Sequence, residues 1–140
     1  GISQISGGSR TSVGGYATPE PKEENSAQFD ISDTRTLDEV VNWLLDMGHI
    51  PSFCTACYRA GRTGDRFMSL VKSGQIANCC APNALITLEE YLGDYASADT
   101  RAKGEVLIQK ELKHIPNPKI KEIAARNLKE IIEGKRDFRF

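Results

Sequence analysis

The residues with the clearest potential for chemistry are the cysteines. The chain has 140 residues and four cysteines, and two of them form a C-x-x-C pair in the stretch Ile50-Pro-Ser-Phe-Cys-Thr-Ala-Cys-Tyr-Arg59. Cys80 follows Cys57 with 22 residues between them, and Cys79 stands directly before Cys80. Two thiols three positions apart in a loop can turn both sulfurs toward one metal centre, and thiolates are soft ligands that bind iron and zinc. The spacing therefore favours a metal site.

The spacing alone leaves several kinds of site open. Cys54, Cys57 and Cys80 would hold three corners of a cubane iron–sulfur cluster and leave one iron free for chemistry. With Cys79 as a fourth thiolate, the site would be a closed zinc site in a zinc-stabilised interaction module, although adjacent side chains normally point apart. A redox dithiol and buried structural thiols are the metal-free alternatives. The four cysteines do not resemble a disulfide scaffold. Their C-x-x-C pairing is more typical of a protein in a reducing compartment.

The composition shows no strong charge bias. Charged residues make up 26% of the chain, hydrophobic residues make up 39%, and the formal net charge is −1. No global attraction to nucleic acid or to a membrane follows from this balance, so we expect neither as a partner. No apolar run approaches the length that spans a bilayer, and the first residues lack the features of a secretory signal. We expect a cytoplasmic protein.

Two extended segments are predicted on either side of a helix in the first half. Residues 1–6 alternate like a short strand, and residues 7–30 are rich in Gly, Ser, Pro and Glu, which predicts a long exposed loop. A capping box at Thr36-Leu-Asp-Glu39 precedes an apolar helix face, and Gly48 supplies the stop. Ile50 to Thr55 is predicted as the second strand.

The order strand, helix, strand predicts a parallel pair of strands joined by a crossover. The cysteine pair then lies at the carboxyl end of the second strand, where α/β proteins gather their active sites. The abrupt opening with a strand, which needs a neighbour for its hydrogen bonds, suggests a piece cut from a longer protein.

The second half is predicted to be helical. Residues 75–83 carry Cys79, Cys80 and a proline, so they are predicted as a turn or loop. A glycine at position 104 weakens one of the helical patterns. The predicted helices are Asp65 to Lys72, a helix from a second capping box at Thr87-Leu-Glu-Glu90 to about Ala96, Asp99 to His114, and a last helix that begins after the N-cap Asn117 and ends at Gly134.

Several stretches around the cysteines carry a resemblance to a known family. They are Ser52-Phe-Cys-Thr-Ala-Cys-Tyr-Arg-x-Gly-Arg-Thr-Gly-Asp-Arg-Phe-Met68, Cys80-x-Pro-Asn-Ala-Leu85, Thr87-Leu-x-Glu-Tyr-Leu92 and the opening Ile2-Ser-Gln-Ile-Ser-Gly-Gly-Ser-Arg-Thr11. The chain resembles the C-terminal portion of the HydG family of [FeFe]-hydrogenase maturases, which are radical S-adenosylmethionine (SAM) tyrosine lyases. The resemblance covers essentially the whole chain, and its cysteine spacing is specific.

The resemblance implies an α/β fold and a division into two parts. Residues 1–66 would be the end of a (β/α)8 radical SAM barrel (a TIM barrel) with a long loop. Residues 67–140 would be an all-helical C-terminal domain of the auxiliary iron–sulfur cluster. The family's C-x3-C-x2-C motif, which binds the SAM-cleaving cluster, does not occur in this sequence. We expect that motif in a missing N-terminal barrel portion, so this chain alone should hold no catalytic residues and be inactive.

The resemblance also implies a site and its partners. Cys54, Cys57 and Cys80 would bind an auxiliary [4Fe-4S] cluster that carries an additional iron, linked through a bound L-cysteine. The family cleaves tyrosine to p-cresol, CO and cyanide and assembles an Fe-CO-CN unit for the hydrogenase. Arg10 resembles the arginine that pairs with the substrate carboxylate, a task that suits a planar guanidinium. The expected partners also include the missing N-terminal portion, with its S-adenosylmethionine and second [4Fe-4S] cluster, and hydrogenase maturation scaffold proteins.

Overall fold

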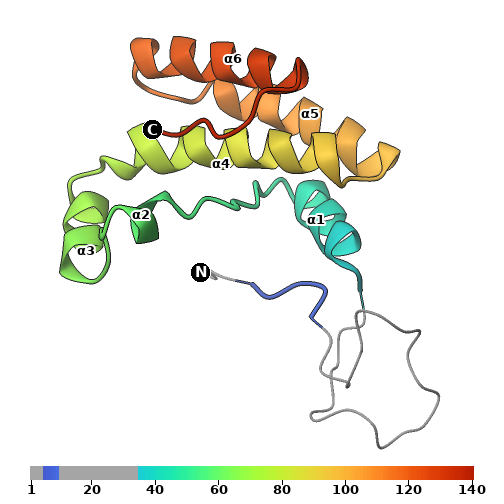
Figure 1. The fold of residues 1–140 in the computed structure, drawn as a ribbon, viewed down its shortest axis with the longest axis horizontal. Helices are drawn as coiled ribbons and strands as arrows, with labels where there is room; N and C mark the ends of the chain where they lie inside the picture. Colours follow the sequence, from blue (N-terminus) through green and yellow to red (C-terminus); the bar gives the residue numbers. More distant parts are fainter. Residues whose placement is uncertain (1–4, 10–34) are drawn as a thin grey trace, which may run out of the picture.

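The structure is a computed structural model that describes residues 5–9 and 35–140. Those residues form six α-helices and no strand (Figure 1). The long helix α4 lies at the centre, with α5 and α6 on one side and the chain that links α1 to α3 on the other (Figure 1). The helices are α1 (Leu37–Asp46), α2 (Ala56–Arg59), α3 (Asp65–Lys72), α4 (Ile76–Asp94), α5 (Ala98–Leu112) and α6 (Pro118–Ile132).

The predicted α/β fold, with the last strands of a barrel, is wrong for the described residues. Ile50 to Thr55 runs without regular secondary structure, so the predicted parallel pair and its crossover are absent too. Extended backbone becomes a strand only where a neighbouring strand supplies hydrogen bonds. Here the apolar residues of the segment pack on helices instead, since Ile50 lies against the buried core. Of the other predicted strand only Ile5 and Ser6 are described, and neither is in regular structure.

Local capping residues set helix ends as predicted. The hydroxyl of Thr36 accepts a hydrogen bond from the Glu39 N–H at 3.3 Å, and the Glu39 carboxylate accepts one from the Thr36 N–H at 2.7 Å. Gly48 follows α1 with a φ of 75°, which only glycine adopts without strain. Asn117 caps α6, where its side chain accepts from the Ile120 N–H at 3.4 Å.

The predicted turn or loop at residues 75–83 is wrong, because Gln75 is the N-cap of α4 and residues 76–83 lie in the first half of that helix. Thr87 and Glu90 therefore lie inside the helix and do not begin one. Pro82 has no N–H and removes one helical hydrogen bond, which disfavours a helix in isolation. The helix persists because its apolar face is buried: Leu88 and Leu92 are 0% exposed. Burial of this face outweighs the single lost bond.

The core lies between α4, α5 and α6, with one face of α1 added. Val41 and Leu45 of α1 share this core with Leu88 of α4 and Leu128 of α6. The predicted division into residues 1–66 and 67–140 stays a prediction. The side chains of α1 are nevertheless continuous with the core of the later helices.

A polar cluster fastens α1 to α4 and α5. The Asp38 carboxylate accepts hydrogen bonds from the Tyr91 hydroxyl at 3.3 Å, the Ser97 N–H at 3.4 Å and the Thr100 hydroxyl at 3.1 Å. Thr100 is completely buried and also accepts from the Asn42 amide at 3.0 Å. The buried hydroxyl of Thr100 thus has hydrogen-bond partners, which avoids the cost of leaving it unpaired.

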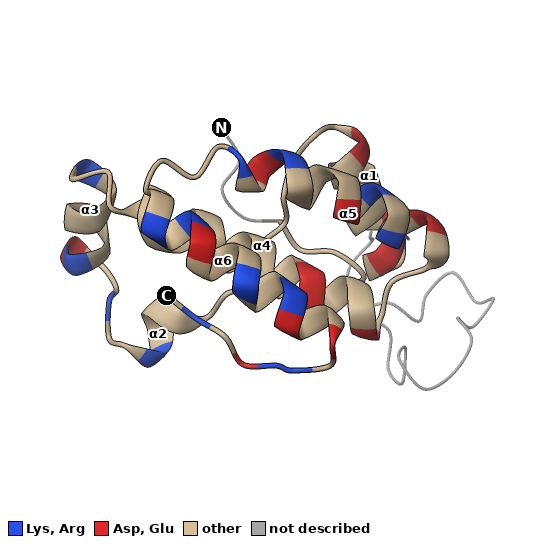
Figure 2. Cartoon of the chain, turned by 90° about the horizontal axis from the view of Figure 1, so that it is seen from above, with Lys and Arg blue, Asp and Glu red and all other residues tan. Residues whose placement is uncertain are grey.

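Charged residues of both signs are interspersed along the surface of α5 and α6 (Figure 2). This arrangement matches the net charge of −1. Within residues 35–140 no helix combines the length and the apolar character needed to cross a bilayer.

The close contact between α4 and α5 generates a prediction on stability. A Cβ atom on Gly104 would lie 2.4 Å from Cδ1 of the fully buried Leu92, whereas one on Gly93 would meet only the Arg136 guanidinium at 3.4 Å. We expect Gly104→Ala to lower the free energy of unfolding by about 1–2 kcal/mol, because overpacking outweighs the gain in helix propensity. Gly93→Ala should raise it by about 0.5–1 kcal/mol. Urea denaturation measures both, and equal stability of the two variants would contradict the packing argument.

Candidate metal centre

The cysteines lie at one end of α4 and in the segment beside it. Cys54 immediately precedes Thr55, the N-cap of the one-turn helix α2, and Cys57 is in that helix. Cys79 and Cys80 are in the first half of α4. All four are partly buried free thiols. The thiols therefore lie in or just before a short helical turn and at one end of a long helix. The prediction that the cysteine pair lies at the carboxyl end of a strand is wrong.

The structure brings two of the thiols together. The Sγ atoms of Cys79 and Cys80 are 3.8 Å apart, although neighbouring residues were expected to point away from each other. The Ala56 N–H donates a hydrogen bond to Cys54 Sγ at 3.4 Å. Within the described ranges no three His, Cys, Asp or Glu side chains converge as a group able to hold a metal ion. The set Cys54, Cys57 and Cys80 thus stays a prediction.

The thiols nevertheless share one electrostatic environment. The pKa of Cys80 is raised from 9.0 to about 11, first by burial and then by Cys79, Cys57 and Cys54. Negative charge on any of these neighbours opposes ionisation of Cys80, so the isolated thiol stays protonated at neutral pH. A bound cation reverses this balance and stabilises the thiolates together. The donor chemistry therefore fits a soft metal ion or an iron–sulfur cluster.

An unpaired donor lies near the same residues. The backbone N–H of Arg62 donates to the Cys57 carbonyl at 2.8 Å, which closes the turn after α2. The Nε atom of Arg62 is buried and has no hydrogen-bond partner among the described residues. A buried donor without an acceptor costs about 1–3 kcal/mol, so a negatively charged group bound here would stabilise it. This orphaned atom also fits an anionic cluster.

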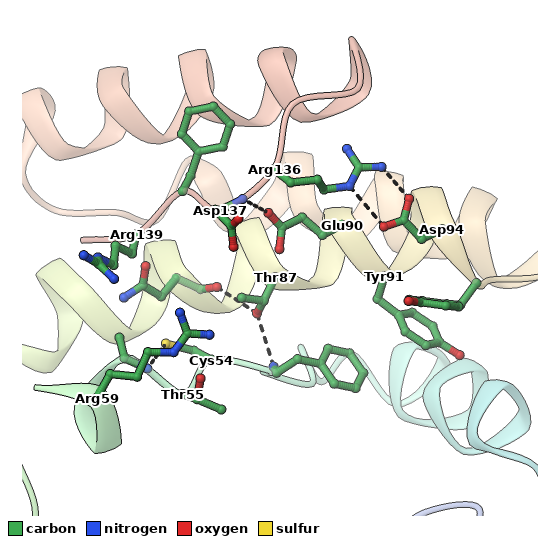
Figure 3. Close-up of a pocket in the computed structure, with 15 residues that line it drawn as sticks. Cys54, Thr55, Arg59, Thr87, Glu90, Tyr91, Asp94, Arg136, Asp137 and Arg139 are labelled. Atoms are coloured by element: carbon green, nitrogen blue, oxygen red, sulfur yellow. Dashed lines mark hydrogen bonds and ion pairs between the residues drawn. The ribbon is translucent and has the colours of Figure 1, made fainter.

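A groove with a volume of about 780 Å³ opens beside Cys54 (Figure 3). One wall is the segment from Phe53 to Ala56 with Arg59, and the other is the C-terminal tail, defined here as residues 136–140. In Figure 3, Arg59 and Arg139 lie at the end of the groove near Cys54. The volume is within the range of small-molecule sites, which usually span about 300–1,000 Å³.

The floor of the groove is a polar stripe on α4 that the sequence reasoning missed. Four of its residues follow helical spacing, so they share one face: Asn83, Thr87, Glu90 and Asp94. Three of them hold the C-terminal tail. Asn83 accepts from the Phe140 N–H at 2.9 Å, Glu90 accepts from the Asp137 N–H at 3.0 Å, and Asp94 forms a two-point ion pair with Arg136. The signal in the sequence was a set of polar residues at i, i+4, i+7 and i+11 within a helix whose other residues are mostly apolar.

The fourth residue of the stripe, Thr87, holds the cysteine segment. Its hydroxyl accepts a hydrogen bond from the Phe53 N–H at 3.2 Å (Figure 3). One turn further along α4, the ring of Tyr91 stacks on the ring of Phe53 with centroids 4.9 Å apart. Burial and then the neighbouring Asp38 raise the pKa of Tyr91 to about 12, so this phenol stays neutral.

One predicted site residue cannot be placed beside these. Arg10, the predicted partner of the substrate carboxylate, lies outside the described residues. The described residues define an α-helical domain that carries a thiol-bearing edge next to a polar groove.

The comparisons with known proteins give this domain a relative. The chain is similar, with 48% sequence identity and a TM-score of 0.89, to a crystal structure of HydG, a maturase of the [FeFe]-hydrogenase. The match covers 100% of this chain and 30% of that chain. No protein-family model matches, and neither does any curated protein. The predicted resemblance to the C-terminal portion of HydG is therefore confirmed, and the chain spans about 30% of the length of that relative.

The ion pair that anchors the tail generates a prediction on pH dependence. Hydrogen bonds from Arg136 hold the pKa of Asp94 below its usual 3.8. A carboxyl group with a lowered pKa in the folded state stabilises the fold above its unfolded pKa, and that stabilisation is lost as pH falls through the folded value. We expect Asp94→Asn to lower the free energy of unfolding at about pH 7, and the difference from wild type to be smaller at about pH 3, which is below the unfolded pKa of the carboxyl group.

Urea denaturation at both pH values checks this expectation. Glu130→Gln is the matched control, because it removes an exposed contact with Lys135 at 3.0 Å and should cost only a few tenths of a kcal/mol. A penalty for Asp94→Asn that is independent of pH would refute the role of the ion pair.

Proposed function

We propose that this chain binds an auxiliary [4Fe-4S] cluster and serves in the maturation of [FeFe]-hydrogenase as part of a radical SAM enzyme. The observation that carries the proposal is the 48% identity over the whole chain to a maturase of the [FeFe]-hydrogenase. Cys54, Cys57 and Cys80 hold the cluster. When bound, the cluster supplies one iron position that no protein thiolate fills, where an additional iron can be attached.

The chain's own residues prepare the site for an anionic cluster. The N–H of Ala56 donates to the sulfur of Cys54, and the unpaired Nε of Arg62 is a donor close to Cys57 in the chain. Cys54 lines the groove, so small ligands have access to this side of the site. Arg59 contributes positive charge on the same side, which favours the approach of anions.

The chemistry of the whole protein is part of the same proposal. The whole protein would cleave tyrosine to p-cresol, CO and cyanide, and the additional iron would be the place at which the two diatomic ligands are collected as an Fe-CO-CN unit. Arg10 binds the carboxylate of tyrosine. S-adenosylmethionine and a second [4Fe-4S] cluster belong to the N-terminal portion, and L-cysteine and hydrogenase maturation scaffold proteins are the further partners. Similarity to HydG supports these assignments.

A zinc-stabilised interaction module is the second candidate, because one distance favours it. A tetrahedral zinc ion with Zn–S bonds of about 2.3 Å separates its sulfurs by roughly 3.8 Å. The Sγ atoms of Cys79 and Cys80 lie 3.8 Å apart. A site of four thiolates would use both, whereas the cluster uses Cys80 without Cys79.

Anaerobic reconstitution with iron and sulfide tests the leading proposal. We expect the absorbance and the electron paramagnetic resonance signal of a cubane cluster in wild type. Both should disappear when Cys54, Cys57 and Cys80 are all changed to Ala, because Cys79 is then the one cysteine left to bind the cluster. Cys79→Ala is the control and should keep both signals.

Metal analysis of anaerobically purified protein separates the two candidates. Iron that persists in Cys79→Ala supports the cluster. One zinc per chain, no iron, and loss of zinc in Cys79→Ala would show the interaction module instead. A cluster that survives the triple substitution would disprove the ligand set.

A further inference from the structure

We propose that Thr87 is a positioning residue that fixes Cys54 relative to Cys80. It acts through the backbone of Phe53 and touches neither thiol. This inference rests on the proposed metal site and deepens it, since it assigns how two ligands from distant parts of the chain are held together.

The cysteine segment has few attachments. Among the described residues, the hydrogen bond from the Phe53 N–H to the Thr87 hydroxyl at 3.2 Å is the only one that joins residues 50–59 to another helix. The contacts of Cys54 itself are local: its N–H donates to the Ser52 hydroxyl at 3.4 Å, and its sulfur accepts from the Ala56 N–H at 3.4 Å. Neither local contact sets where the segment lies on α4.

The hydroxyl of Thr87 is oriented for this role. It donates its single proton to the Asn83 carbonyl at 2.9 Å, a bond back along the helix. The oxygen lone pairs then remain available to the Phe53 N–H. Because the donor direction is set by α4 itself, the acceptor presented to the segment is fixed before the segment binds.

A second contact prevents the segment from turning about this bond. The rings of Phe53 and Tyr91 stack with an interplanar angle of 16°. The Tyr91 hydroxyl is held in turn by Asp38 at 3.3 Å. Phe53 is therefore held by its backbone at Thr87 and by its ring at Tyr91, and these two points fix the direction in which the chain enters Cys54.

The third predicted ligand is on the same helix as this anchor. Cys80 precedes Thr87 by seven residues, which is about 10 Å along a helix axis. A single helix thus carries one predicted ligand and the attachment point for the segment that bears the other two predicted ligands. Loss of the attachment would leave Cys54 and Cys57 free to move relative to Cys80, and groups that orient metal ligands typically contribute about 10–100-fold in metal affinity.

Substitutions at Thr87 test the inference in the full 140-residue chain. Thr87→Val keeps the shape and removes the hydroxyl, and Thr87→Ser keeps the hydroxyl. Thr63→Val is the matched control, because Thr63 is exposed, does not line the groove, and its side chain makes no hydrogen bond among the described residues. We expect exchange of the Phe53 amide hydrogen to be fast only in Thr87→Val, since that variant alone lacks the acceptor.

Binding of Co²⁺, measured against a competing chelator, reports the effect on the ligands. We expect Thr87→Val to bind Co²⁺ about tenfold more weakly than wild type and to show a weaker thiolate-to-cobalt charge-transfer band. Thr87→Ser and Thr63→Val should behave like wild type. Unchanged affinity and an unchanged spectrum in Thr87→Val would overturn the inference about Thr87 and leave the proposed function intact. Wild-type protein that binds neither Co²⁺ nor iron would overturn both the inference and the proposed function.

Discussion

The structure depends on the two faces of α4. One face must be buried, because Leu88 and Leu92 are completely removed from solvent between the neighbouring helices. The opposite stripe carries amide, hydroxyl and carboxylate groups that require partners wherever water is excluded. The C-terminal tail meets this requirement at Asn83, Glu90 and Asp94. One helix therefore organises the core on one side and the groove on the other.

The same helix links stability to the candidate site. Asp38 of α1 accepts from Tyr91, Tyr91 stacks on Phe53, and Phe53 leads directly into Cys54. These contacts join residues that are far apart in the sequence into one continuous set. The position of the first thiol is consequently set by the packing of α1 on α4 as well as by the loop that contains it.

The thiols add an electrostatic constraint to this packing. Burial raises the pKa of Cys80, and each of the other three cysteines opposes its ionisation further. Several neighbouring thiolates repel one another when no cation is bound, and a bound cation offsets this repulsion. Metal binding and deprotonation of the thiols are therefore coupled. The choice between three thiolates and four depends on Cys79, whose sulfur lies beside that of Cys80.

The sequence by itself determined the features that depend on neighbouring residues. The capping box at Thr36, the N-cap at Asn117 and the stop at Gly48 arise from hydrogen bonds and backbone preferences within a few residues. The C-x-x-C pair and its distance to Cys80 were likewise visible in the sequence, and they led to the resemblance to HydG.

Only the tertiary structure decided what depends on distant partners. The segment from Ile50 to Thr55 has strand-like residues, but none of the residues described by the structure forms a strand beside it, and α4 binds it through Thr87. A helix runs through Pro82 because burial of its apolar face outweighs one lost hydrogen bond. The groove exists because Asn83 meets Phe140, 57 residues away in the sequence, and no local pattern encodes such a contact.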